Sequence, residues 1–295
     1  MPELPEVEAV RRSLEQLVVG KTIERVDVRL PRIVRTPSPE VFVQSLTGRR
    51  VEAVNRRGKY LLLTVSPFLL ISHLRMEGQY RLTETDVDEL PHTHVVFQFT
   101  DGTELRYRDV RQFGTMDLVR SPSEWPDGLA RLGPEPFDPL LTPQLLKSRL
   151  ASRTVPIKAA WLDQTVLAGV GNIYADEALF AAGIHPEKPA GKLTTLELSR
   201  LLHETREVLQ KAVDAGGSSI RSYVNGYGRH GGFQISLAVY GRDGEPCVRC
   251  GTTLEKTRVA GRGTHWCPSC QRKPRTRRAR AKTSREGEKD GRNSR

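Results

Sequence analysis

The chain begins with Met1-Pro2-Glu3-Leu4-Pro5-Glu6, and an amphipathic segment follows this opening directly. Apolar residues recur there at three- to four-residue spacing until Gly20, which predicts a helix with one buried face. Prolines and acids in a first helical turn are ordinary, because the unpaired N–H groups and the helix dipole favour them. Taken alone, the opening is explained by helix capping. The apolar positions are Val7, Val10, Leu14, Leu17 and Val18.

The same six residues also permit covalent chemistry. If Met1 is removed, Pro2 presents a secondary amine, and an α-amino group has a pKa of about 7.7–8.0 against about 10.4 for lysine. The neutral fraction of such an amine can attack an electrophilic carbon and form a Schiff base. Glu3 and Glu6 lie beside it as candidate proton donors or orienting carboxylates.

Short strands at close spacing follow this helix. Residues 60–65 and 69–74 are apolar runs, and residues 94–99 and 103–107 alternate in polarity around a Thr-Asp-Gly turn, which indicates a hairpin. An earlier strand is marked by Ile23, Val26, Val28 and Leu30. The pattern predicts an α+β fold whose N-terminal domain, residues 1–132, is a β-sandwich carrying the first helix.

The second half has helical periodicity. A proline-rich segment, residues 133–140, is the expected linker. Residues 143–150, 173–182 and 195–215 follow helical patterns, so we expect a helical domain over residues 141–232. It ends in a stretch, residues 216–232, with six glycines, for which a mobile surface loop is the plain interpretation. One apolar strand is expected between this stretch and the cysteines.

All four cysteines lie in the segment 233–271, as two CxxC pairs, Cys247/Cys250 and Cys267/Cys270, separated by sixteen residues. This spacing suits one tetrahedral structural zinc ion, Zn²⁺. Disulfides fit poorly with a cytoplasmic chain, and a redox CxxC needs no second copy. Bound metal would contribute on the order of 10 kcal/mol to folding this small module. Basic residues between the pairs suit phosphate binding or simple solvation.

Length and charge limit the function classes. No apolar run could span a membrane, and no signal peptide is evident, so we expect a cytoplasmic protein of two cored domains without a membrane partner. The net charge of +11 suggests a polyanionic partner, but residues 271–295 carry +8 of it. We expect the tail, residues 272–295, to be disordered and either to add non-specific phosphate affinity or only to solubilise. Nothing indicates an oligomer, so we expect a monomer.

Four motifs together carry a family resemblance. They are the opening Pro-Glu-Leu-Pro-Glu, residues 57–60 (Arg-Gly-Lys-Tyr), residues 169–174 (Gly-Val-Gly-Asn-Ile-Tyr) and the paired CxxC knuckles. In this order they resemble the formamidopyrimidine-DNA glycosylases, bacterial base-excision repair enzymes that remove 8-oxoguanine and ring-opened purines and then cut the strand. The resemblance implies a helix–two-turn–helix domain, a zinc finger, and damaged double-stranded DNA bound between the domains.

The resemblance also assigns roles to residues. Pro2 matches the Schiff-base nucleophile, Glu3 the proton donor, Glu6 a supporting carboxylate and Lys59 the lysine that serves β-elimination. Arg262 matches the zinc-finger arginine that grips phosphate and assists δ-elimination. The implied DNA contacts are His92, Arg111, Met76, Phe113, Lys158, Asn172 and Arg153, of which Met76, Arg111 and Phe113 fill the gap left by the extruded base.

Several of these residues have plainer interpretations. Lys59 and Lys158 could be solvated lysines, and Met76 and Phe113 could be core residues. Asn172 precedes a helix and is expected as its N-cap, where it could also meet a phosphate. The sequence departs from the family pattern at Arg75, where a small residue is common, and at Gln112, where a basic one is common.

Two rival functions stay open from the sequence. One is a non-catalytic, zinc-dependent DNA-binding protein, which would share the metal and the DNA affinity but not the cutting. The other is an enzyme like endonuclease VIII, which favours oxidised pyrimidines. Against it, the resemblance implies that the glycine-rich stretch with Tyr223, Tyr227 and Arg229 closes over an extruded purine.

Overall fold

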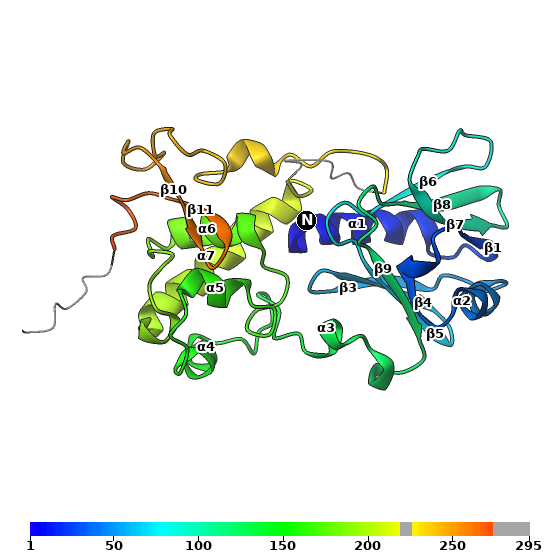
Figure 1. Cartoon of the computed structure of the whole chain (residues 1–295), viewed down its shortest axis with the longest axis horizontal. Coiled ribbons are helices and arrows are strands. Elements are labelled where there is room, and N and C mark those ends of the chain that lie inside the picture. Colours follow the sequence, from blue (N-terminus) through cyan, green and yellow to red (C-terminus); the bar gives the residue numbers. More distant parts are fainter. Residues whose placement is uncertain (219–225, 274–295) are drawn as a thin grey trace, which may run out of the picture.

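The structure is a computed structural model, and it describes residues 1–218 and 226–273. A β-rich half and a helical half lie side by side, with the N-terminus between them (Figure 1). The predicted α+β fold is confirmed. None of the helices described combines the length and apolarity of a membrane span.

The opening of the chain forms helix α1 (Leu4–Val18). Its apolar stripe is buried, with Val7, Val10 and Leu14 each at most 1% exposed. The helix packs on strand β3 (Ala53–Arg57) of the first domain and also on helix α7 (Thr195–Asp214) of the second. The N-terminus of the chain is therefore held at the junction of the two halves.

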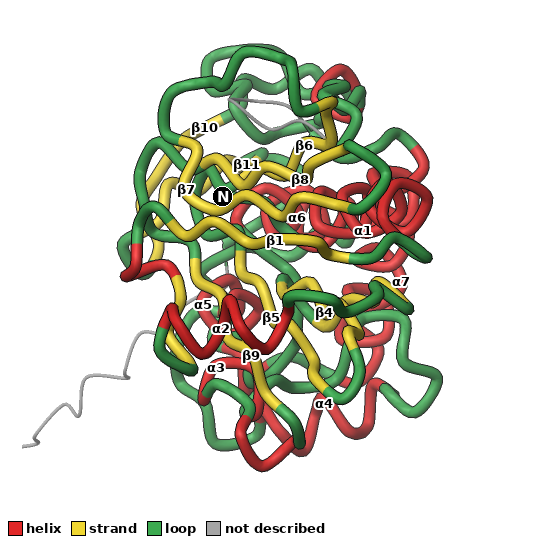
Figure 2. Tube along the Cα trace, turned by 90° about the vertical axis from the view of Figure 1, so that its right-hand side faces the viewer, coloured by secondary structure: helices red, strands yellow, loops and turns green. Residues whose placement is uncertain are grey.

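Two sheets form the predicted β-sandwich, and Figure 2 views this end of the molecule. One sheet has the order β1-β7-β8-β6 and the other the order β2-β9-β5-β4-β3, with a parallel pair only at β2 and β9. The first contains β1 (Ile23–Val28), β6 (Gln79–Glu84), β7 (Thr93–Phe99) and β8 (Thr103–Arg108). The second contains β2 (Val34–Thr36), β3, β4 (Tyr60–Val65), β5 (Phe68–His73) and β9 (Thr115–Val119).

Buried aliphatic and aromatic side chains from both sheets and from α1 form one core, which includes Leu61, Tyr80 and Phe97. Short helical segments connect the strands, and two of them add Ile33, Phe42 and Leu46 to this core. They are η1 (Pro31–Ile33), α2 (Pro39–Leu46), η2 (Pro122–Glu124) and α3 (Asp127–Ala130). Helix α2 was not predicted, although Ser38 caps it by accepting the Val41 N–H at 3.4 Å.

The helical half has its own core around Trp161, Tyr174 and Leu201. Its three predicted helices are confirmed, and the structure adds the short helix α5 before the glycine turn. Thr194 and Glu197 form a capping box at the start of α7. The remaining elements are α4 (Pro143–Leu150), α5 (Ile157–Leu162), α6 (Asn172–Ala181) and η3 (Ala190–Lys192).

The prediction of an apolar strand before the cysteines is wrong. Residues 233–236 form the 3₁₀ turn η4 (Phe233–Ser236), and the next segment needs no partner strand. Its N–H groups at Ala238, Val239 and Tyr240 all donate to the Glu177 carboxylate of α6, at 2.8, 2.9 and 2.8 Å. A side chain thus satisfies the backbone that a sheet would otherwise pair.

A hairpin of β10 (Glu255–Val259) and β11 (Arg262–Trp266) lies between the two CxxC pairs. The predicted disordered tail corresponds largely to residues 274–295, and the predicted mobile loop corresponds in part to residues 219–225. These, including Tyr223, lie outside the described residues.

Candidate active site and zinc centre

A cleft of about 520 Å³ lies between the two halves at the chain's N-terminus. It brings together residues from both domains and from the zinc-finger hairpin, which are far apart in the sequence. All five predicted catalytic residues line it, as do two of the predicted DNA contacts. These are Pro2, Glu3, Glu6, Lys59 and Arg262, with Met76 and Asn172.

Glu3 is held in the cleft by the backbone of α6. Its carboxylate accepts the backbone N–H of Ile173 at 3.0 Å and of Tyr174 at 3.4 Å, both in the first turn of α6. The glycine turn before α6 makes room for it, because a Cβ on Gly171 would lie 2.1 Å from the Glu3 carboxyl carbon. Glu3 therefore occupies the anion position at a helix N-terminus.

Burial nevertheless dominates the titration of this group. Removal from water raises the pKa of Glu3 to about 7, the nearby Lys59 lowers it, and Glu6 raises it again. A carboxyl group with such a pKa is partly protonated at neutral pH and can give up its proton there. This is the property of a general acid.

Glu6 supports the site from the next turn of α1. Its carboxylate accepts the Tyr174 hydroxyl at 2.5 Å, the Ser218 N–H at 2.8 Å and the Glu3 N–H at 2.7 Å. Burial raises the pKa of this carboxyl as well, against the effect of those hydrogen bonds. Glu6 thus joins the chain's beginning to α6 and to the start of the glycine-rich stretch.

Lys59 enters the cleft from the turn between β3 and β4. Gly58 has φ +58°, and its N–H donates to the linker residue Glu135 at 2.6 Å. The Lys59 side chain is 5% exposed, and burial lowers its pKa, while the charges of Glu3 and Glu6 act in the opposite sense. Lys59 is therefore not the solvated lysine that its local sequence allowed, and its amine is neutral more often than a surface lysine's.

The N-cap interpretation of Asn172 is wrong. Gly171 is the N-cap residue of α6, and the helix's free N–H groups go to Glu3 instead. The Asn172 amide donates to the Gly263 carbonyl at 3.0 Å, and its Oδ1 is buried without a hydrogen-bond partner among the described residues. Asn172 therefore connects α6 to the hairpin that carries the exposed Arg262.

Five of the seven predicted DNA contacts do not line the cleft, and two of these five, Lys158 and Arg153, are held in ion pairs. Lys158 has no exposed side-chain surface and pairs with Asp176 at 2.7 Å, so a phosphate could reach its ammonium only if the hairpin moved. Arg153 is partly exposed and pairs with Asp163 at 2.6 Å. Both phosphate contacts stay predictions.

The predicted wedge residues lie on two turns at the rim. Met76 is partly buried in the cleft wall, whereas Phe113 is 54% exposed with the Arg111 guanidinium 5.0 Å from its ring centroid. Phe113 is therefore not a core residue. Arg75 and Gln112 in these turns have positive φ, at 52° and 58°, and so does His92, just before β7, at 68°, which places three non-glycine residues in the left-handed region. Such conformations persist only where the surroundings enforce them.

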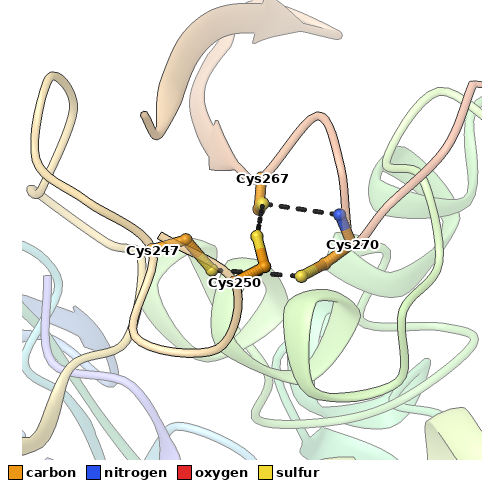
Figure 3. A group of neighbouring side chains, drawn as sticks. All are labelled: Cys247, Cys250, Cys267 and Cys270. Carbon is orange, nitrogen blue, oxygen red and sulfur yellow. Dashed lines mark hydrogen bonds between the residues drawn. The ribbon is translucent and has the colours of Figure 1, made fainter. Parts of the chain in front are cut away.

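The four cysteines form one compact cluster (Figure 3). Their sulfur atoms all lie within 4.8 Å of one another, with Cys247–Cys270 at 3.9 Å and Cys250–Cys267 at 3.5 Å. Thiolates on a tetrahedral zinc, with Zn–S bonds of about 2.3 Å, stand about 3.8 Å apart. These separations fit one zinc ion and exclude disulfides, whose S–S bond is about 2 Å.

Three parts of the chain match models of known protein families. Residues 1–116 match the model of the formamidopyrimidine-DNA glycosylase N-terminal domain, and residues 132–224 match that of its H2TH domain. Residues 244–272 match the zinc finger found in FPG and IleRS. The chain belongs to the formamidopyrimidine-DNA glycosylase family. The four-cysteine cluster is accordingly the zinc site of this family's finger.

Individual relatives of the glycosylase family cover nearly the whole chain. A formamidopyrimidine-DNA glycosylase of Bacillus cereus is 55% identical over 273 residues, which are 92% of this chain and 99% of the relative. One of Geobacillus kaustophilus is 54% identical over 274 residues, 92% of this chain and all of the relative.

Solved structures of the family agree with the fold. A complex of a Lactococcus lactis FPG mutant with Fapy-dG-containing DNA has a TM-score of 0.87 and 45% identity, and covers 92% of this chain and all of that one. A complex of MutM with carbocyclic 8-oxo-G-containing DNA has a TM-score of 0.86 at the same identity and coverage.

Some functional contacts were missed from the sequence. Tyr174 and Ser218 hold Glu6, Asp176 holds Lys158, and Glu135 holds the turn before Lys59. The spacing of the two glycines before Asn172 was the available signal for a close approach of another segment. It did not indicate which segment approaches.

Proposed function

We propose that the chain is a bifunctional DNA glycosylase and AP lyase that acts in base excision repair. It excises oxidised purines, 8-oxoguanine and formamidopyrimidines, from duplex DNA and then cuts the strand. Family membership over most of the chain and the DNA lesions in the complexes of its relatives support this substrate class. The monomeric state stays a prediction.

The observation that carries the proposal is the placement of Glu3. Its carboxyl group is buried beside Pro2, in a cleft that also contains Lys59 and Arg262, and its pKa is raised to about 7 by burial. A DNA-binding protein without catalysis has no need for a desolvated acid next to a secondary amine.

The chemistry follows from these groups. With Met1 removed, the Pro2 nitrogen attacks C1′, the bond from C1′ to the base breaks, and the proton that the Pro2 nitrogen loses neutralises the departing base. Glu3 gives its proton to the ring oxygen as the sugar opens, leaving an iminium between Pro2 and C1′. That cation acidifies the C2′ protons.

Strand cutting uses the same adduct. Lys59 in its neutral form takes a C2′ proton, and the 3′ phosphate leaves by β-elimination. A second elimination releases the 5′ phosphate, while Arg262 neutralises the charge of the departing group. Zinc takes no part in these steps; bound to the four cysteines, it fixes the fold of the hairpin that presents Arg262.

DNA binding in this proposal uses residues that line the cleft, Met76, Asn172 and Arg262, and others that lie around it. Asn172 and Arg262 meet phosphates beside the lesion, and Met76, Arg111 and Phe113 fill the space that the extruded nucleotide leaves. His92 and Arg153 contact the backbone farther out.

The test is strand cleavage by protein whose initiator methionine has been removed. We expect cutting of an 8-oxoguanine duplex, weaker cutting of a thymine-glycol duplex and none of undamaged DNA. A matched variant with one extra residue before Pro2 should bind the damaged duplex but not cut it. No cutting by the processed protein, or equal cutting by the extended variant, would refute the proposal.

A further inference from the structure

A buried charge cluster joins the helical domain to the zinc-finger hairpin. Asp176, on α6, is 1% exposed. One of its carboxylate oxygens lies 2.7 Å from the Lys158 ammonium, and the other accepts the His265 N–H of β11 at 3.0 Å. The acid thus contacts α5 and the hairpin at once.

Lys158 continues this connection toward Arg262. Its ammonium donates to the Gly263 carbonyl at 2.8 Å and to the Thr264 hydroxyl at 2.7 Å. These are the two residues that directly follow Arg262 at the start of β11. Asp176 and Lys158 therefore hold three consecutive hairpin residues, through the Gly263 carbonyl, the Thr264 hydroxyl and the His265 N–H, while Arg262 lines the cleft.

Stability alone gives no reason for this arrangement. Burial lowers the pKa of Lys158 because it penalises the ammonium, and the attraction to Asp176 offsets part of that penalty. A buried ion pair is often no more stable than an apolar pair of the same size, although removing one partner is costly. What an apolar pair could not provide is the directed hydrogen bonds to the hairpin backbone.

The neighbouring acid holds the finger at a second place. Glu177 accepts three consecutive N–H groups of the segment that enters the finger, from residue 238 to residue 240. Adjacent acids on α6 thus fix both the entry of the finger and its hairpin. The first turn of the same helix binds the Glu3 carboxylate, so α6 carries the contacts of both catalytic regions.

We propose that Asp176 is a positioning residue which, through Lys158, holds the hairpin so that Arg262 reaches the phosphate at the lesion. The proposal rests on the proposed function, because it concerns the phosphate contact of that same site. It predicts that Asp176 and Arg262 act as one unit, whereas a general role in folding would be independent of Arg262.

The test is a double-mutant cycle on the zinc-loaded full chain. The probe is a duplex with a tetrahydrofuran abasic analogue, which is bound without Schiff-base chemistry. We expect Asp176→Asn to weaken binding on the order of tenfold, and to have no further effect when Arg262→Ala is already present. On an 8-oxoguanine duplex, Asp176→Asn should also shift the products from δ- toward β-elimination.

A matched control is Lys188→Met, which breaks the Lys188–Glu197 pair of the same helical domain away from the cleft. It should bind as the wild type does. Zinc content and the melting temperature are measured for every variant. If Asp176→Asn loses zinc or unfolds, Asp176→Asn/Lys158→Met replaces it, since this double variant buries no unpaired charge. We expect this double variant to show the same tenfold loss of binding to the abasic duplex, and the loss should again depend on the presence of Arg262.

If Asp176→Asn weakened binding of the abasic duplex equally in the presence and absence of Arg262, or did not weaken it at all, the positioning role would be overturned. Failure of the proposed enzyme activity would give a different result from failure of the positioning role. A wild type that binds the abasic duplex but never cuts 8-oxoguanine DNA would refute the enzyme, and the binding cycle would still decide the role of Asp176.

Discussion

The carboxylate of Glu3 accepts the backbone N–H of Ile173 at 3.0 Å, so the beginning of the chain caps a helix of the second domain. This contact brings the first residues of the chain to the N-terminus of α6. Gly171 permits it, because any side chain there would overlap the carboxyl group. The same carboxylate thus joins the two domains and, in the proposed mechanism, supplies the proton.

Glu3→Gln should stabilise the protein above neutral pH while abolishing base excision. The folded-state pKa of Glu3 is about 7 against 4.5 for an unperturbed glutamate, so the folded state binds the proton more tightly. The stability that protonated Glu3 provides is complete below pH 4.5 and is lost as the pH rises through 7. The advantage of Gln should therefore grow by about 2 kcal/mol between pH 5 and pH 8. Denaturant unfolding at both pH values measures it; a constant difference would contradict the raised pKa.

Lys59→Met should separate the two activities. The base is still released, because Pro2 and Glu3 are intact, but strand cutting should slow by about 10²-fold without the amine that takes the C2′ proton. Single-turnover assays with and without alkaline treatment resolve the two steps. Lys59→Arg is the control for charge, since a guanidinium is not neutral at any relevant pH. Cutting by the arginine variant at the wild-type rate would exclude Lys59 as the base.

Gly171→Ala should displace Glu3. The added Cβ would lie 2.1 Å from the Glu3 carboxyl carbon, so the carboxylate must leave the first turn of α6. A shift of about 1 Å at a reacting group can cost about 10²-fold in rate. We expect such a loss in single-turnover excision, with damaged-DNA affinity reduced much less. An unchanged rate would mean that the Glu3 contact with α6 is not needed for the reaction.

Removal of zinc should release the finger. The chain has four cysteines, all in the cluster, so one zinc ion per chain should protect all of its thiols from a thiol reagent. A strong chelator should expose four thiols and weaken DNA binding, because the hairpin with Arg262 loses its support. Readdition of zinc is the control. Four reactive thiols in the zinc-loaded protein would contradict the assignment.

The local parts of this structure were predictable from the sequence. The stripe of Val7, Val10 and Leu14 predicted α1, and the two CxxC pairs predicted the metal site, because periodicity and ligand spacing are short-range properties. The resemblance to the family added the cleft residues, and all five predicted catalytic residues do line the cleft.

The contacts that place those residues were not predictable. Glu3 and Ile173 of α6 are 170 residues apart in the sequence, yet they are hydrogen-bonded. Because the Glu3 carboxylate accepts the free N–H groups of α6, the prediction that Asn172 is the N-cap is wrong. The strand expected before the cysteines is replaced by backbone bonds to Glu177, and Lys158 is buried against Asp176. In each case a carboxylate from elsewhere in the fold satisfies groups that local patterns assign to near neighbours.

Covalent bonding of Pro2 to the sugar at the lesion is the central step of the proposed reaction. Protein lacking Met1 is mixed with an 8-oxoguanine duplex in the presence of borohydride, and the trapped adduct is digested and mapped by mass spectrometry. We predict that the deoxyribose remnant is on the N-terminal peptide, at the Pro2 nitrogen. An adduct on a lysine peptide instead, or active protein that still carries Met1, would contradict the account.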